Sequence, residues 1–327
     1  MTGFVLTIIT FVGFQMMLAL GMNVLWGYDG LLNLSYIVYY AFGAYVTGTL
    51  MLPKASPPTT YYILGLHLPF VPAAVIGLAA SGVLAALVGW LFLGSRLRPE
   101  YFPIVTLVAA SAALQFVSQD QPLFNGFGGL IAIPQPFGAS LSPTAYGILF
   151  LMLVFAVVAI TAAFCGVLRR SGLGRQMRAV REDSLAASAY GINVFRTKMK
   201  AHVIGGVISA AAGILTIVYV GAFAPSGWSI GETIVALSCV FIGGSGNNIG
   251  AMVGAAIVVV VFNEGTQLLL PLVPGLSSSS AIIAEVQPVA LNLLVIVVLR
   301  WRQQGLVPEH VQDLYPERRR SRFAAVA

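Results

Sequence analysis

The sequence predicts an all-α, polytopic integral membrane protein with about eight to ten transmembrane helices and short broken or re-entrant segments. Hydrophobic residues make up 58% of the 327 residues and charged residues only 9%, whereas a soluble domain carries about 25% charged residues. The mean hydropathy is +0.90. Apolar residues gather in long stretches, and the few basic residues gather between them. We therefore expect lipid to surround most of the chain.

Roughly nine apolar stretches predict the membrane-crossing helices, because a helix needs about 20 apolar residues to span the hydrocarbon core. In chain order they are 4–26, 31–52, 70–94, 101–117, 144–168, 201–221, 230–242, 250–272 and 282–299. The first stretch has no basic residues before it and is too long for the apolar core of a signal peptide. We expect it to be retained as the first helix.

Glycines interrupt the apolar pattern at two places. Gly27 and Gly30 separate the first two stretches, and Gly243, Gly244 and Gly246 separate the seventh from the eighth. Non-helical backbone at membrane depth persists only where protein or water satisfies its polar groups. These breaks are therefore candidate linings of a permeation path, and ordinary short loops are the alternative.

The basic residues predict the orientation of the chain. Sixteen of the 17 lysines and arginines lie in the segments 96–98, 169–200 and 300–322, and Lys54 is the exception. An even number of predicted helices separates each segment from the next, so all three face one side, which the positive-inside rule makes cytoplasmic. We expect an external N-terminus, a membrane domain at 1–300 with a cytoplasmic loop at 169–200, and a polar cytoplasmic tail at 301–327. The same bias explains the net charge of +6, and no basic motif with interleaved aromatic residues indicates a nucleic-acid partner.

The longest internal cytoplasmic segment has the composition of a helix. Residues 174–191 are rich in alanine, and Gly191 is a plausible helix stop. Met177, Val180 and Leu185 fall near helical spacing. Such a helix could lie along the membrane surface and fill a groove on a cytoplasmic partner. A solvated connecting loop with a basic face is the alternative.

Short motifs with a family resemblance recur along residues 20 to 306. They are NVLWGYDGLLNLS (23–35) with GAY (43–45), YFPIVTL (101–107), GFGGL (126–130) with IP (133–134), GR (174–175), RAVRED (178–183), AA (186–187), GIN (191–193), SI (229–230) with Glu232, GGSG (243–246), and Gly250 with Gly254. In this order they resemble the permease subunits of ABC importers of the branched-chain amino acid type. SYI (35–37) is bulkier than the corresponding family stretch, and NN (247–248) makes the end of the glycine turn more polar. Both departures lie where a solute would pass.

The resemblance implies two sets of functional residues. The coupling set, which would meet an ATPase subunit, is Arg175, Arg178, Arg181, Glu182, Asp183, Ala186, Ala187 and Gly191. The translocation-pathway set is Asn23, Asn33, Ser35, Tyr45, Thr106, Glu232, Ser245 and Asn247. The implied partners are a second homologous permease, two ATP-binding cassette subunits and an external solute-binding protein, in a bacterial-type inner membrane. The implied cargo is a branched-chain amino acid or a similar small polar solute.

The sequence itself carries no motif for ATP hydrolysis. A P-loop needs a glycine-rich turn that ends in Lys-Ser or Lys-Thr, and none of Lys54, Lys198 and Lys200 follows such a turn. We therefore expect no enzymatic activity, no catalytic residue and no cofactor in this chain, with ATP and Mg used by separate subunits. No two histidines have metal-ligand spacing. Cys165 and Cys239 lie within apolar runs, so no metal site is expected.

Carboxylates within apolar stretches support an alternative function. Glu232, Glu264 and Glu285 lie in or beside predicted helices, and the bilayer penalises an ionised side chain by about 2.5 kcal/mol or more. An ion-gradient-driven secondary transporter of small solutes would use Glu232 or Glu264 as its titrating group. A membrane scaffold without transport is a third possibility. The energy source that drives uptake distinguishes the two transporter classes.

Overall fold

The computed structural model describes residues 2–55, 60–94, 99–136, 138, 141–260, 289, 293, 295–298, 300–302 and 304–309. Within these residues the regular structure is helical, and β structure is limited to two isolated bridges, Tyr62 with Phe124 and Leu130 with Phe223. The predicted all-α fold is confirmed. Glu264, Glu285, most of the predicted helix 282–299 and residues 310–327 of the predicted tail lie outside the described residues.

Six helices in the described part of the chain are long and apolar enough to cross a membrane. They are α1 (Thr2–Met22) continued by η1 (Asn23–Tyr28), α3 (Phe70–Gly94), α4 (Phe102–Gln119), α6 (Pro143–Arg170), α9 (Val194–Val220), and α10 (Ile230–Gly243) with the preceding η4 (Pro225–Gly227). The shorter apolar helices α2 (Tyr36–Met51) and α11 (Asn248–Ile257) occupy the second and eighth predicted stretches. Three short elements, η2 (Pro99–Tyr101), α5 (Gln121–Phe124) and η3 (Gly126–Gly128), flank α4. This set agrees with the predicted eight to ten helices.

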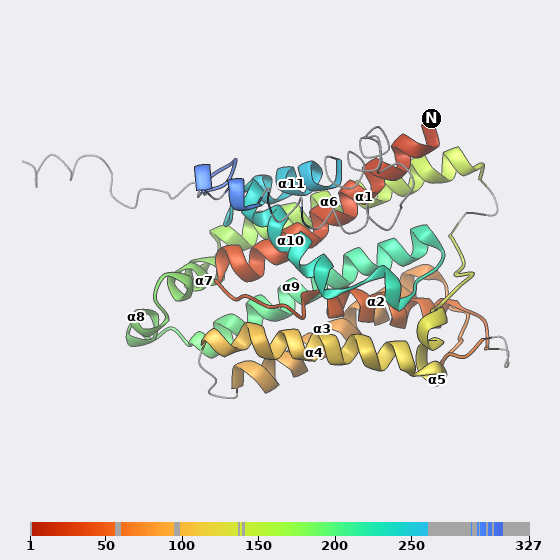
Figure 1. Ribbon diagram of the computed structural model, residues 1–327, viewed down its shortest axis with the longest axis horizontal. Helices are drawn as coiled ribbons and strands as arrows, with labels where there is room; N and C mark the ends of the chain where they lie inside the picture. The colour runs from red at the N-terminus through yellow and green to blue at the C-terminus, as the bar shows by residue number, and fades with distance from the viewer. Residues whose placement is uncertain are drawn as a thin grey trace, which may run out of the picture.

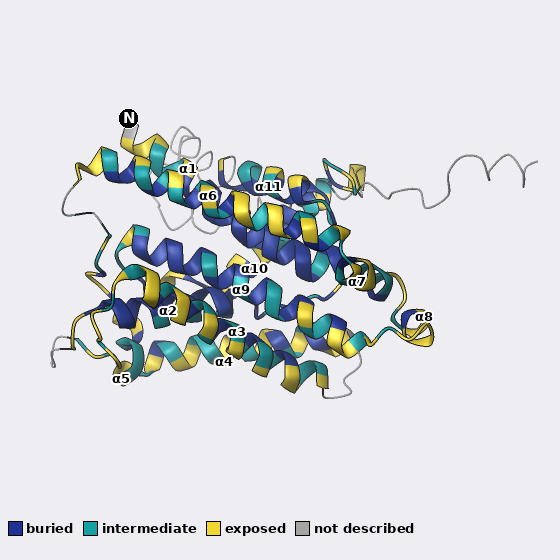
Figure 2. Cartoon of the chain, turned by 180° about the vertical axis from the view of Figure 1, so that it is seen from behind, coloured by how far each residue is buried: buried dark blue, intermediate teal, exposed yellow. Residues whose placement is uncertain are grey.

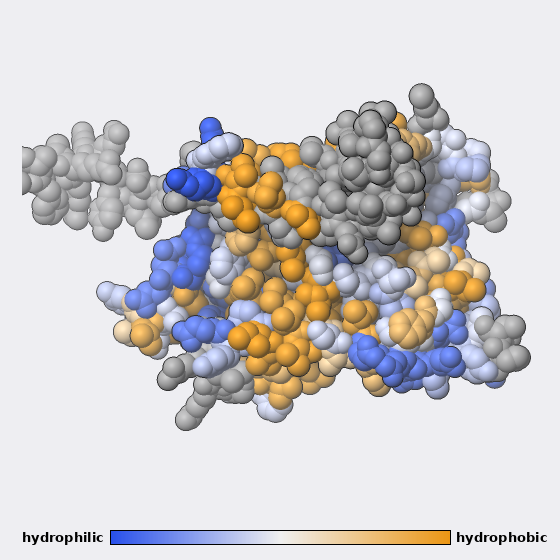
Figure 3. Space-filling model, viewed as in Figure 1, coloured by the Kyte–Doolittle hydropathy of each residue, from blue (hydrophilic) through white to orange (hydrophobic). Residues whose placement is uncertain are grey.

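Helix α9 forms the centre of the bundle. It packs against α1, α2 and α3, while α1 also packs against α6, α10 and α11. Figure 1 shows the long helices running along one axis, with α2, α3 and α4 on one side of α9 and α1, α6, α10 and α11 on the other. Most of α9 is buried, as Figure 2 shows, whereas only 22% of the apolar stretch is buried in each of α3, α4 and α6. In Figure 3 hydrophobic residues form a band across the middle and hydrophilic residues lie at both ends, as expected for a membrane protein.

Small residues allow α2 and α9 to approach each other closely. A Cβ atom at Gly43 of α2 would lie 2.8 Å from the Ala210 Cβ of α9, and a Cβ at Gly213 of α9 would overlap the Tyr40 carbonyl of α2. Helices in lipid associate chiefly through such van der Waals packing, because lipid tails are as apolar as the side chains. Close packing on α9 therefore holds α2 in the core although it has only 16 residues.

The helix breaks predicted from glycine are present. Helix α1 continues as the π-helix η1 and ends near Gly30, whose φ is 70°, before α2 begins. Between α10 and α11, Gly244 and Gly246 have φ values of 120° and 82°, a backbone region that favours glycine. The π geometry of η1 was not predicted, and such segments are frequent at functional sites.

The segment predicted to be cytoplasmic forms two helices, α7 (Gly172–Glu182) and α8 (Ser184–Ala189), which project from one end of the bundle (Figure 1). We call residues 172–191 the arm. The prediction of one helix over 174–191 is wrong at Asp183. The Asp183 carboxylate accepts hydrogen bonds from the backbone N–H groups of Leu185 and Ala186 at 2.9 and 3.0 Å, so it caps α8 and separates it from α7. Gly191, with a φ of 82°, follows the end of α8.

Candidate functional site

The base of the arm is anchored to the end of α6. Met177 and Val180 of α7 are buried, and Met177 packs with residues of α1, η1 and α6. Arg175 Nη1 and Arg178 Nη2 donate to the last two carbonyls of α6 at 3.0 and 3.2 Å. These carbonyls have no partner within their own helix. Two residues of the coupling set therefore position the arm.

The tip of the arm exposes apolar side chains. Leu185 is 83% exposed and Tyr190 is 88% exposed, whereas Ala187 is only 4% exposed. Ala186, also in the coupling set, lies on the exposed side of α8. Leu185 and Tyr190 are therefore candidates for contact with a partner protein. The predicted coupling set contains Ala186 and Ala187 but neither Leu185 nor Tyr190. The available signal was that Leu185 and Tyr190 are large apolar residues in a segment of small and charged ones.

An ion pair joins the arm to the C-terminal part of the chain. Arg181 Nη2 lies 3.0 Å from Glu309 Oε2, and Arg181 Nη1 donates to the carbonyl of Gly27 in η1. Glu309 ends a segment at 304–309, which we call the strap. Within the strap, Leu306 N and Val307 N donate to the last two carbonyls of α10 at 2.9 and 2.8 Å. Arg181 therefore links the arm to η1 and to the strap, and the strap in turn contacts the end of α10.

The two carboxylates around Arg181 differ in exposure. Glu309 has a side chain that is 14% exposed, compared with 24% for Arg181 and 72% for Glu182. Water therefore weakens the 2.9 Å contact between Arg181 and Glu182 much more than the contact with Glu309. The sequence did not predict that Glu309 is a partner of Arg181.

A buried amide cluster joins η1 to the glycine turn. Asn23 Nδ2 and the Tyr28 hydroxyl both donate to Asn248 Oδ1, at 3.1 and 2.5 Å, and Asn23 Oδ1 accepts from Gly246 N at 2.8 Å. Asn23 is fully buried. Asn247 Nδ2 donates to a strap carbonyl at 3.1 Å. Asn23 and Asn247 thus connect segments at the arm end of the protein.

A second buried cluster lies between η1 and α2. Asn33 Oδ1 accepts hydrogen bonds from Ser35 N and Ser35 Oγ at 2.9 and 2.7 Å. Asn33 Nδ2 lies 3.5 Å from His202 Nδ1, and the Tyr39 hydroxyl lies 2.8 Å from His202 Nε2. Thr106 Oγ1 accepts a hydrogen bond from the backbone N–H of Leu34 at 3.1 Å. The structure adds His202, which is fully buried, to this group.

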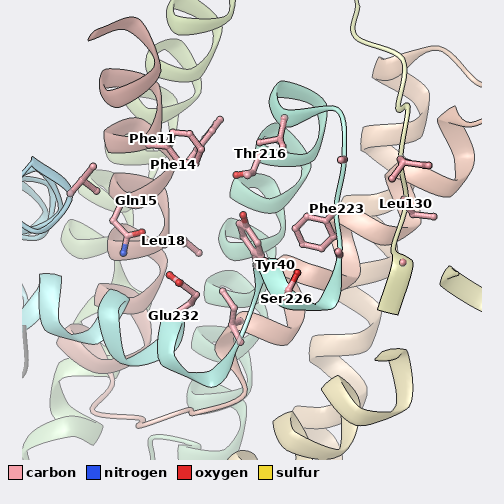
Figure 4. Close-up of a pocket in the computed structure, with 18 residues that line it drawn as sticks. Phe11, Phe14, Gln15, Leu18, Tyr40, Leu130, Thr216, Phe223, Ser226 and Glu232 are labelled. Atoms are coloured by element: carbon pink, nitrogen blue, oxygen red, sulfur yellow. The ribbon is translucent and has the colours of Figure 1, made fainter. Parts of the chain in front are cut away.

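A cavity of about 410 Å³ lies between α1, α2, α9 and the start of α10, away from the arm (Figure 4). We call it the outer cavity. Its polar lining includes Gln15, Tyr40, Thr216, Ser226 and Glu232. Its apolar lining includes Phe11, Phe14, Leu18, Leu130, Phe223 and Val259. A mostly apolar cavity with a few convergent polar groups is the usual form of a small-molecule site.

A separate cavity of about 250 Å³ contains Ser35 and Tyr45 of the predicted pathway set. Trp228 Nε1 donates to the Tyr45 hydroxyl at 3.4 Å. The remaining lining consists mainly of aliphatic and aromatic side chains such as Val38, Leu84 and Phe116. This cavity offers fewer polar groups to a solute than the outer cavity.

The family model for the permease component of the branched-chain amino acid transport system matches residues 4–299. The chain belongs to this permease family. High-affinity branched-chain amino acid transport system permease protein LivM of Escherichia coli K12 is 30% identical over 319 residues, which cover 89% of this permease and 67% of the relative. A probable LivM of Methanocaldococcus jannaschii is 25% identical over 289 residues, 86% of this permease and 81% of the relative. LivH of Escherichia coli K12 is 27% identical over 256 residues, 74% of this permease and 78% of the relative. No solved structure significantly matches the permease.

The permease distributes the predicted pathway residues over separate places. Asn23 and Asn247 lie with the half-buried Ser245 near the glycine turn. Asn33, Ser35 and Thr106 belong to the buried cluster beside α2, and Tyr45 lines the smaller cavity. Of this set, Glu232 is the one that reaches the outer cavity.

Proposed function

We propose that this permease is the membrane-spanning subunit of an ATP-binding cassette importer and forms a translocation pathway with a second homologous permease. Relatives named for branched-chain amino acid transport support branched-chain amino acids, or similar small polar solutes, as the cargo. Similarity to both LivM and LivH supports a pair of permeases. Two ATPase subunits that hold ATP and Mg, and an external solute-binding protein, complete the transporter. It lies in a bacterial-type inner membrane with its N-terminus outside and its arm in the cytoplasm.

The observation that carries this proposal is the arm. It projects from the bundle with Leu185 and Tyr190 exposed, and a short helix with apolar anchors suits a groove on a partner protein. Arg181 at its base contacts η1 and the strap. An ATPase that displaced the arm would therefore also move η1, at the first glycine break, and the strap, which contacts the second. A local contact can bias a larger rearrangement in this way.

Reconstitution in proteoliposomes tests the coupling. The assay combines the permease with the second permease, the ATPase subunits and the loaded binding protein. Leu185→Asp and Tyr190→Asp should each lower solute-stimulated ATP hydrolysis and uptake about tenfold, because interface anchors commonly contribute more than about 1 kcal/mol. Gln176→Asp makes the same charge change on the exposed side of α7 and should retain the activity of the wild type. Unchanged activity in both tip variants would refute coupling through the tip.

The second candidate function is an ion-gradient-driven transporter, which the carboxylate of Glu232 in the outer cavity favours. A protonophore added at constant ATP distinguishes the two. Uptake by an ATP-driven importer should continue under these conditions, whereas uptake by a proton-driven carrier should stop.

A further inference from the structure

Glu232 does not complete the cap of its own helix. Ser229 and Glu232 occupy the spacing of a capping box, in which the two side chains bond to each other's backbone N–H groups. Within the described residues, Ser229 makes no side-chain cap hydrogen bond, and the Glu232 carboxylate has no hydrogen-bond partner. Figure 4 shows this carboxylate pointing from α10 into the outer cavity, toward Gln15 and Leu18 of α1. A partner for the Glu232 carboxylate would therefore have to lie within the outer cavity.

The Glu232 side of the cavity offers hydrogen-bond acceptors. Gln15 uses its Nε2 to donate to Cys239 Sγ at 3.5 Å, and its Oε1 makes no hydrogen bond to the part of the chain that the structure describes. Among the described lining residues, Glu232 is the only charged one. A carboxylate without a cationic neighbour in apolar surroundings favours a cationic group that enters the cavity.

Hydroxyl groups line the cavity at α2 and α9. The Tyr40 hydroxyl of α2 lies beside Thr216 of α9. Thr216 Oγ1 donates its proton to a backbone carbonyl one turn earlier at 2.8 Å. Of the two hydroxyls, Tyr40 is therefore the one with a proton left to donate, either to Thr216 Oγ1 or to a ligand. Phe14 and Phe223 supply apolar walls of the cavity. The cavity volume of about 410 Å³ is at the lower end of the range for small-molecule sites, about 300–1,000 Å³.

We propose that the outer cavity is a transient binding site for a zwitterionic amino acid on its way through the permease. Glu232 and the Gln15 amide oxygen accept hydrogen bonds from the α-ammonium, the Tyr40 hydroxyl donates to the α-carboxylate, and the phenyl rings contact an apolar side chain. This inference rests on the proposed transport function. One charged contact suits a pathway, because a transported solute must be bound weakly enough to leave again.

A cysteine reporter tests the charge and the ligand of the cavity without relying on transport. Ser226 lines the cavity and is exposed, while the native Cys165 and Cys239 are buried. In the assembled transporter, Ser226→Cys should react faster with a cationic methanethiosulfonate than with an anionic one, and Glu232→Gln should remove this preference. Millimolar leucine should slow the labelling, whereas 4-methylpentanoate, which lacks the ammonium group, should not. Thr144→Cys, exposed at the start of α6, should show neither effect.

Uptake measurements provide the second arm of the test. Glu232→Gln should lower leucine uptake per ATP hydrolysed about tenfold, equivalent to about 1.4 kcal/mol, and Glu232→Asp should recover part of the loss. One outcome refutes the binding site and leaves the importer assignment intact. In that outcome the wild type shows ATP-driven uptake, leucine does not slow the labelling of Ser226→Cys, and the Glu232→Gln variant transports leucine normally. If leucine protects Ser226→Cys but uptake does not depend on ATP, the importer assignment fails and the site stands.

Discussion

The contact between Arg181 and Glu309 should hold the strap to the arm with a measurable coupling energy. The two side chains are 24% and 14% exposed and lie 3.0 Å apart. Fully exposed pairs contribute about 0–1 kcal/mol, while hydrogen bonds to charged groups contribute about 1.5–3 kcal/mol. Because both side chains remain partly exposed to water, we lower the second range and expect a coupling energy of about 1–2 kcal/mol. Arg181→Met should cost more than Glu309→Gln because it also leaves the Gly27 carbonyl without this donor.

A double-mutant cycle on the purified permease measures this coupling. The melting temperatures of the wild type, Glu309→Gln, Arg181→Met and the double variant are compared, with about 2–4 °C expected for each kcal/mol. Arg175→Gln removes an exposed guanidinium contact to a carbonyl of α6 and should change stability by less than about 0.5 kcal/mol. If the two single effects add to within about 0.5 kcal/mol, the strap is not held by this ion pair and the reasoning is refuted.

Two further predictions concern packing and pH. Gly213→Ala should destabilise the permease by about 1–3 kcal/mol, because the added Cβ would overlap the Tyr40 carbonyl, whereas Gly166→Ala, with open space at that position, should not lower the melting temperature. Burial raises the pKa of Asp29, just after η1, from 3.8 to about 7, and Lys198 opposes this shift. The folded state therefore binds the proton more tightly, so stability should fall as pH rises from about 4 to about 7 and stay constant above that. Melting temperatures across this pH range should show the fall in the wild type and lose it in Asp29→Asn.

The sequence predicted the helices well because the requirement for crossing a membrane is local. About 20 apolar residues must occur in a row, and this holds for α3 and α6 whatever surrounds them. The glycine breaks were also visible, since few other residues adopt the φ of 120° at Gly244. The break in the arm was missed because Asp183 ends one helix and caps the next only when its own backbone is extended, and alanine-rich composition does not reveal that choice.

By itself the sequence determined the membrane class, the order of the helices, the clustering of basic residues and the family. The tertiary structure alone decided that Arg181 meets a carboxylate 128 residues away, that Ala187 is buried while Leu185 is exposed, and that Glu232 faces a cavity. Hydrophobicity and helix length belong to a segment, so they can be read along the chain. The direction in which one side chain points depends on how helices distant in sequence cross, which the packing of the whole bundle sets.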